Sequence, residues 1–205
     1  SKMQKRIVET LSFMECEKLL TELRHPSTSV RTTEQNVRNH ACATLMLEAG
    51  LRIGEVVRLR IDDLVFGGKP KPTLICKAGI AEKGCNREIP LTRAAEAAIQ
   101  ELINKVWHDL DSDFMFPAFP GRLKHRPITP RQLERIISIA AKNSIGRHIR
   151  PHVLRHTFAT RLMKYANMRI VQTLLGHKSI TSTQVYTHPG KDDLEIAIAA
   201  MQARI

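Results

Sequence analysis

The stretch HVLRHTFATRL, residues 152–162, places a histidine and an arginine three positions apart in a helix-forming segment. Side chains with this spacing lie on the same face of a helix, so His152 and Arg155 can together grip one anion. The zinc-protease motif HExxH has a similar outline, but Val153 stands where its glutamate base is required, and Arg155 would repel a metal cation. An isolated pair of this kind is more often two surface residues, so the rest of the chain must indicate whether this pair binds an anion.

A second stretch, LLGHKSITSTQVYTH at residues 174–188, carries His177 directly after an apolar helix and a glycine. Tyr186 follows nine residues later, and the chain has only one other tyrosine. That residue, Tyr165, follows the segment HTFAT and precedes the next helix, where a packing role is expected. Tyr186 is therefore the candidate nucleophile.

Two upstream stretches add further charged candidates. EAGLRIGEVVRL, residues 48–59, supplies Arg52 and, three residues later, Glu55. IAEKGCNREIPL, residues 80–91, supplies Lys83 between two short segments with strand character. The candidates are thus distributed over most of the chain.

With these motifs the chain resembles the tyrosine recombinase family, also called the phage-integrase family. The second box of that family contains HxLRH(T/S)FAT, and the third contains LLGH with the nucleophilic tyrosine nine residues later. The first box, a segment like TGLRIxEL, matches residues 48–59 here. The resemblance implies a mainly α-helical fold with a small antiparallel β-sheet, of the α+β class.

The chemistry explains why the family needs these residue types. A phosphodiester resists attack because its oxygens are negative, and charge shifts among them in the transition state. Arginine is always charged and donates paired hydrogen bonds to phosphate, so Arg52 and Arg155 are the expected clamp. A tyrosine hydroxyl with an ordinary pKa of about 10 is a poor nucleophile at neutral pH. His152 is the candidate base that activates Tyr186.

The other roles rest on the resemblance. Lys83 is the implied general acid for the leaving 5′ oxygen. Because the interval from Lys83 to the following proline is slightly shorter than in many relatives, Lys77 is the alternative. His177 is expected to donate to a nonbridging oxygen. Glu55 is expected to orient a catalytic partner, and its alternative role is a helix cap at the surface. No metal or other cofactor is implied.

The charge of the chain agrees with a DNA partner. In 205 residues, 32 Lys and Arg stand against 20 Asp and Glu, which gives a formal net charge of +12. A polyanionic partner is the simplest explanation. The four cysteines have neither metal-site nor disulfide-scaffold spacing, and the sequence shows no signal peptide or membrane span. We expect a cytoplasmic, nucleoid-associated protein of prokaryotic, phage or mobile-element origin, with no membrane contact.

Capping signals and apolar periodicity predict the elements. Strands are expected at TLIC and REIPL, around the turn-forming KGCN. Helices are expected at residues 12–24, at 33–49 ending before Gly50, from 92, from 129, and as short helices in the last third of the chain.

The predicted organisation has three parts: residues 1–11 as the remnant of an interdomain linker, 12–191 as the catalytic domain and 192–205 as a C-terminal helix. Family members carry a core-binding domain before this region, so we expect the chain to be a fragment. The apolar stripe of the tail matches a helix that relatives dock into a neighbouring protomer. Its members are Leu194, Ile198, Met201 and Ile205.

The resemblance implies site-specific recombination of duplex DNA through a 3′-phosphotyrosyl intermediate, by a homo-tetramer acting on two DNA sites. One alternative is relaxation of DNA by a type IB topoisomerase-like enzyme, which the close spacing of LLGH and Tyr186 disfavours. The other is a non-catalytic DNA-binding regulator on the same scaffold, which would not need the catalytic series.

Overall fold

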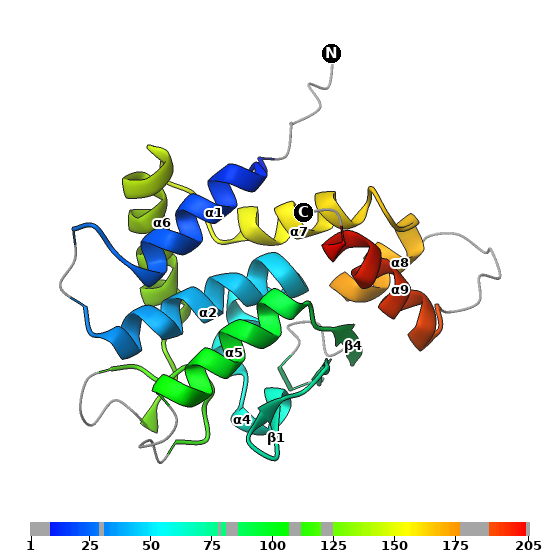
Figure 1. Ribbon diagram of the computed structural model, residues 1–205, viewed down its shortest axis with the longest axis horizontal. Helices are drawn as coiled ribbons and strands as arrows, with labels where there is room; N and C mark the ends of the chain where they lie inside the picture. The colour runs from blue at the N-terminus through cyan, green and yellow to red at the C-terminus, as the bar shows by residue number, and fades with distance from the viewer. Residues whose placement is uncertain are drawn as a thin grey trace.

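The computed structural model describes residues 9–28, 31–77, 79–80, 86–106, 112–119, 125–176 and 189–203. This part of the chain is mainly helical, with two small antiparallel sheets (Figure 1). No helix within it is both long and apolar enough to cross a bilayer. The helices are α1 (Phe13–Arg24), α2 (Thr33–Ala49), α3 (Ile53–Arg58), α4 (Ile61–Leu64), α5 (Arg93–Lys105), α6 (Pro130–Ile145), α7 (His152–Leu162), α8 (Met168–Leu175) and α9 (Lys191–Gln202). The strands are β1 (Val65–Phe66), β2 (Lys69–Pro70), β3 (Thr73–Cys76) and β4 (Arg87–Pro90).

The capping signals in the sequence set the starts of the long helices. The Ser12 side chain accepts a hydrogen bond from the backbone of Glu15, and the Glu15 carboxylate accepts one from the backbone of Ser12. The same reciprocal pair begins α2 and α6, and Pro130 occupies the first position of α6. The predicted helices from 12, 33, 92 and 129 are confirmed, because each signal acts within one helical turn.

Helix α2 runs through the centre of the molecule, where it contacts α1, α5, α6 and α7 (Figure 1). Most of its residues are buried, and they include polar ones such as Arg38, Asn39 and Glu48. A helix that is buried on all sides has no single apolar stripe that would reveal its position. The sequence therefore predicted the bounds of α2 but not its central place.

Gly50 ends α2 in the left-handed conformation, with φ of 65°. A Cβ atom at this position would lie 2.4 Å from Cδ1 of Phe158 and 3.1 Å from Cδ2 of Leu175. Only glycine therefore allows the end of α2 to lie this close to α7 and α8.

The predicted antiparallel sheet is formed by β3 and β4, with Cys76 opposite Arg87. Most of the turn between them lies outside the described residues. A second, shorter hairpin, which was not among the predicted elements, joins β1 and β2 through Gly67 and Gly68. Two glycines with positive φ in a two-residue turn are a recognised hairpin signal.

Helix α9 packs on its own chain against α7, α8 and β4 (Figure 1). Its buried face consists of Leu194, Ala197, Ile198 and Met201, which includes three members of the predicted apolar stripe. The fourth member, Ile205, lies outside the described residues.

The three cysteines in the described ranges, Cys16, Cys42 and Cys76, are buried free thiols. Burial raises the pKa of Cys42 to about 12 and those of Cys16 and Cys76 to about 11. Thiols with such pKa values stay protonated at neutral pH, so these three serve as small apolar core residues.

Candidate active site

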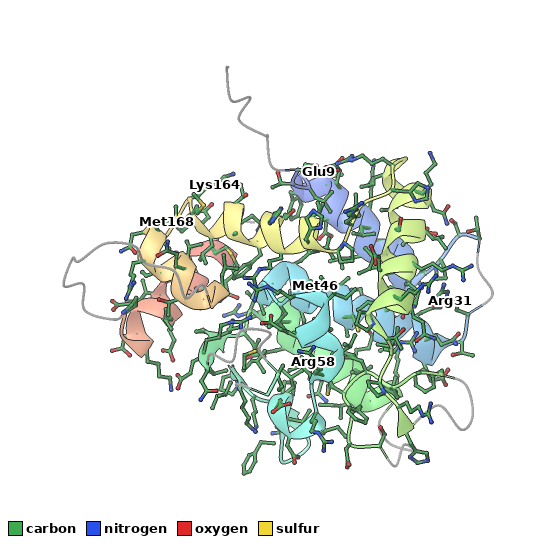
Figure 2. The ribbon with its side chains drawn as sticks, turned by 180° about the vertical axis from the view of Figure 1, so that it is seen from behind. Glu9, Arg31, Met46, Arg58, Lys164 and Met168 are labelled. Atoms are coloured by element: carbon green, nitrogen blue, oxygen red, sulfur yellow. The ribbon has the colours of Figure 1, made fainter. Side chains whose placement is uncertain are left out.

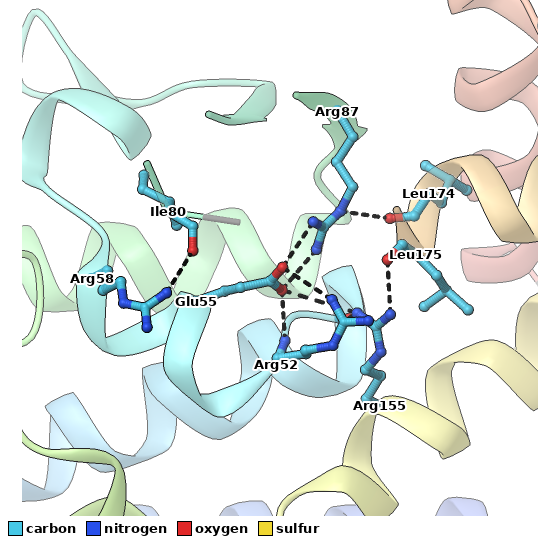
Figure 3. Close-up of polar contacts among 9 residues, drawn as sticks. Arg52, Glu55, Arg58, Ile80, Arg87, Arg155, Leu174 and Leu175 are labelled. Carbon is cyan, nitrogen blue, oxygen red and sulfur yellow. Dashed lines mark hydrogen bonds and ion pairs between the residues drawn. The ribbon is translucent and has the colours of Figure 1, made fainter. Parts of the chain in front are cut away.

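Glu55 lies at the centre of a cluster of arginines (Figure 3). It occupies the third position of α3, and its Oε2 accepts a hydrogen bond of 2.8 Å from the backbone nitrogen of Arg52. Its side chain is fully buried, with 0% exposure. Glu55 therefore caps α3, which was the alternative role, but it does so from the interior and not from the surface.

Arg87 makes the tightest contact with Glu55. Its Nη1 lies 2.9 Å from Oε1 of Glu55 and its Nη2 lies 2.7 Å from Oε2, so the two groups form a bidentate pair. The Nε of Arg87 donates to the carbonyl of Leu174 at 3.0 Å. Arg87 thus joins α3, the start of β4 and the end of α8.

The pattern of REIPL predicted a strand, but the role of Arg87 was not predicted. The available signal was its alternation with Ile89, because residues two apart in a strand face the same side. Both are buried in β4, whereas Glu88 between them is exposed. A charged residue at an inward position of a strand requires a partner, and Glu55 supplies it.

Arg155, in the first turns of α7, is nearly buried and contacts the ends of two other helices. Its Nη1 donates to the carbonyl of Gly50 and its Nη2 to the carbonyl of Leu175, each at 2.7 Å. Its Nη1 also lies 4.0 Å from Oε2 of Glu55. Carbonyls at helix C-termini lack intrahelical partners and favour a cation, so Arg155 fixes α2 and α8 against α7.

Arg52, with 20% of its side chain exposed, is the most accessible of the three arginines around Glu55. Its Nη1 lies 3.4 Å from Oε1 of Glu55. Burial tends to raise the pKa of Glu55, but the hydrogen bond and charge of Arg87, the Arg52 backbone and the charge of Arg155 together hold it below its ordinary value. Three guanidiniums and one carboxylate leave the cluster with a formal charge of +2, which suits a phosphate transition state.

Gly176 allows the chain after α8 to pass close to Arg87. Its backbone adopts the left-handed conformation, with φ of 70°. A Cβ atom at this position would lie 3.0 Å from both Cδ and Nη1 of Arg87. The glycine of LLGH is therefore required both by its backbone conformation and by the arginine beside it.

His152 is the first residue of α7 and its side chain is exposed. Its ring packs edge-on against His156, with the ring centroids 5.1 Å apart. Burial, and then the charges of His152 and Arg155, lower the pKa of His156. His156 is therefore in contact with the candidate base.

Some of the remaining candidate residues lie in the described part of the chain, and others lie outside it. Near the hairpin, Arg58 donates through Nη1 to the carbonyl of Ile80 at 3.1 Å, which ties the segment before the candidate lysine to α3 (Figure 3). The alternative lysine, Lys77, lies 3.4 Å from Oδ1 of Asp63. Tyr165 packs against the core, as expected. Three candidates lie outside the described residues: Lys83, His177 and Tyr186.

No three His, Cys, Asp or Glu side chains in the described ranges come together as potential metal ligands.

Residues 9–192 match the model of the phage integrase family. The chain is 36% identical over 173 residues to tyrosine recombinase XerC of Oceanobacillus iheyensis, and the match covers 81% of this chain and 54% of the relative. The chain thus spans about half the length of the curated relatives it matches.

Solved structures of recombinases share the fold. The crystal structure of XerA recombinase has a TM-score of 0.65 and 25% identity, with 96% of this chain and 66% of that chain covered. The pre-cleavage complex of XerH site-specific recombinase bound to its difH substrate has a TM-score of 0.62 and 24% identity, with 83% and 47% covered.

Proposed function

Because the chain belongs to the phage integrase family of tyrosine recombinases, we propose that it is the catalytic part of a site-specific recombinase. Its substrate is duplex DNA, which it cuts and rejoins through a covalent phosphotyrosine. The observation that carries this proposal is the Glu55 cluster, in which a buried carboxylate and two helix ends hold Arg52 and Arg155 in place.

In the proposed first step, the hydroxyl oxygen of Tyr186 attacks the scissile phosphorus and its proton passes to His152. The bond from phosphorus to the 5′ oxygen breaks, and Lys83 supplies the proton that leaves a free 5′ hydroxyl. Arg52, Arg155 and His177 stabilise the negative oxygens of the phosphate. A 3′-phosphotyrosyl bond has then replaced a phosphodiester, so its energy is retained for rejoining without ATP.

The partner and the assembly follow from the same proposal. The XerH recombinase was solved bound to its difH substrate, and the net charge of +12 on this chain suits duplex DNA as a partner. We propose that four copies act on two DNA sites, in the nucleoid of a bacterial cell or of the host of a mobile element. In this scheme residues 12–191 perform the chemistry.

The nucleophile is tested with a Tyr186→Phe variant on a nicked suicide substrate, whose covalent adduct is resolved on a denaturing gel. The variant removes one oxygen and no charge, so adduct formation should be abolished while DNA binding stays nearly intact. An adduct that persists would exclude Tyr186 as the nucleophile. If the unaltered chain forms no adduct with its native site, the DNA-binding regulator becomes the better explanation.

We also propose that α9 can occupy the corresponding surface of a neighbouring protomer and so couple cleavage to assembly. Its buried face is apolar and would fit the same surface of α7, α8 and β4 on a second copy. Deletion of residues 192–205 should weaken association on DNA in gel shifts and alter cleavage, while circular dichroism still reports a folded domain. If the truncated chain assembles and cleaves normally, the exchange does not occur.

A further inference from the structure

A second group of arginines lines a cleft at the other end of α2 from Glu55. The cleft has a volume of about 280 Å³ and lies between the first turns of α2, the first half of α6 and residues 118–119 and 128. Arg31, at its rim, lies near one edge of the molecule, well separated from Arg58 on α3 (Figure 2). The cleft is thus distinct from the candidate active site.

Arg38 forms the floor of this cleft and is only 4% exposed. Within the described part of the chain its hydrogen-bond partners are neutral: the carbonyl of Pro117 at 2.8 Å and Oδ1 of Asn39 at 2.9 and 3.1 Å. The guanidinium also lies 5.4 Å from the centroid of the Phe119 ring. Burial lowers the pKa of Arg38 to about 10, as expected for a cation held in the interior without a carboxylate.

Two more arginines border the same space. Arg31 is half-buried, and burial together with the charge of Arg135 lowers its pKa. Arg135 is exposed on α6, so it can reach a ligand at the mouth of the cleft. No aspartate or glutamate is among the described residues that line the cleft. Arg38 and Arg135 therefore bring two like charges to a cleft whose described lining holds no acidic side chain.

The other polar groups of the cleft are also suited to an anion. Gln35 and Gln132 each turn their carboxamide oxygen to the start of their own helix, at 3.1 Å from the nitrogen of Thr32 and 3.0 Å from that of Thr129. What each amide can still offer a ligand is an N–H donor. Helices α2 and α6 both begin here, and their dipoles add positive potential.

We propose that this cleft binds a backbone phosphate of the DNA duplex, at a point remote from the phosphate that is cut. The proposal rests on the proposed function only in taking DNA as the source of the phosphate. A free phosphate-bearing molecule would satisfy the same chemistry. Duplex DNA is favoured because Arg38 and the Gly50 carbonyl that binds Arg155 lie on the same rigid helix.

The helix sets the expected position of that phosphate. Twelve residues separate Arg38 from Gly50, and a rise of about 1.5 Å per residue gives roughly 18 Å along the axis. For a duplex that lies along α2, a rise of about 3.4 Å per base pair makes this distance about five base pairs. The cleft should therefore fix the register of the DNA arm beside the cleavage point.

The first test compares Arg135→Gln with Lys18→Gln in the full chain. Both changes remove one exposed positive charge, but Lys18 lies on α1 and does not line the cleft. Affinity for a labelled duplex is measured at several salt concentrations. Loss of one phosphate contact lowers the slope of log affinity against log salt by about 0.9, so between 50 and 200 mM salt Arg135→Gln should lose roughly threefold less affinity than the unaltered chain. Lys18→Gln should keep the slope of the unaltered chain. If the two variants lower the slope equally, the proposal is overturned.

A second test locates the phosphate. Neutral methylphosphonates are placed one at a time along a cleavable duplex. One position, about five base pairs from the cut, should weaken binding of the unaltered chain more than binding of Arg135→Gln, because part of the contact is already missing in the variant. The proposal is overturned if no position shows this coupling.

Inorganic phosphate separates the two sources of the ligand. If millimolar phosphate raises the melting temperature of the unaltered chain but not of Arg135→Gln, while the two salt slopes on duplex DNA are equal, the cleft serves a free anion and the DNA assignment is wrong. Covalent adduct formation is scored separately. Absence of an adduct combined with the expected slopes would remove the recombinase mechanism and leave the cleft proposal standing.

Discussion

The two ends of α2 both meet buried arginines, but in the described part of the chain only the arginines at the C-terminal end contact a carboxylate. At the C-terminal end, Glu55 forms a bidentate pair with Arg87 and lies within 4.0 Å of Arg155. At the N-terminal end, Arg38 is bound by a carbonyl and an amide oxygen, and its pKa is lowered to about 10. A buried carboxylate fixes the direction of the guanidiniums around it, whereas neutral acceptors hold a cation and leave its charge for a ligand.

Stability should show the largest difference between the two ends. Glu55→Ala leaves Arg87 buried without its counter-charge, a change that costs about 3–5 kcal/mol. Arg38→Met removes a buried charge and leaves two neutral acceptors without a donor, which costs about 1–3 kcal/mol. Urea unfolding measures both, with Glu48→Ala as a control at the more exposed ion pair to Arg161. An Arg38→Met variant that is as unstable as Glu55→Ala would contradict this comparison.

Catalysis should depend on the C-terminal end. Arg52→Ala should lower the rate of adduct formation at saturating DNA by about a hundredfold, or about 2.7 kcal/mol, because one preorganised cation is lost from the transition state. Arg135→Gln should act mainly on the DNA concentration needed for half-saturation. Single-turnover cleavage of a suicide substrate separates these effects, with Lys18→Gln as the charge control. Equal loss of rate in the two arginine variants would show that the ends do not differ in role.

Backbone packing gives a smaller contrast. Gly176 and Gly146 both have positive φ, 70° and 80°, but a Cβ atom would approach Arg87 only at Gly176. Gly146→Ala should cost about 1 kcal/mol for the left-handed backbone, whereas Gly176→Ala should cost about 2 kcal/mol because Arg87 must also shift. Thermal unfolding measures the difference. Equal losses of stability in the two variants would mean that the Arg87 side chain can move away from residue 176 at no cost.

The pH dependence of stability should show the smallest effect. The folded pKa of Glu55 lies below its ordinary value, so its contribution is fully present above about pH 4.3 and is lost as the pH falls through the folded pKa. Glu55→Gln should therefore flatten the acid limb of the stability curve by on the order of 1 kcal/mol. The lowered pKa of Arg38 disfavours folding at every pH below about 10, so Arg38→Met should leave the acid slope unchanged. The midpoints of urea unfolding, measured between pH 3 and 7, test both expectations.

Local signals predicted much of the fold. The capping boxes at Ser12 and Thr129 gave helix starts that the structure confirms. The β3–β4 pair was also predicted, whereas the hairpin at Gly67 and Gly68 was missed although its turn residues are typical. For the candidate site, motif spacing indicated Arg52, Glu55, His152 and Arg155, while Arg87 passed as an ordinary strand residue.

The sequence by itself determined the helix boundaries and the chemical types of the candidate residues, because capping and periodicity act between residues three or four apart. The partners of the buried arginines were decided only by the tertiary structure. Arg87 meets Glu55 across 32 positions, Arg38 meets Pro117 across 79 and Arg155 meets Gly50 across 105. Such pairs depend on how whole elements pack around α2, and no local pattern encodes that packing. For this reason the two arginine clusters look alike in the sequence and differ in the fold.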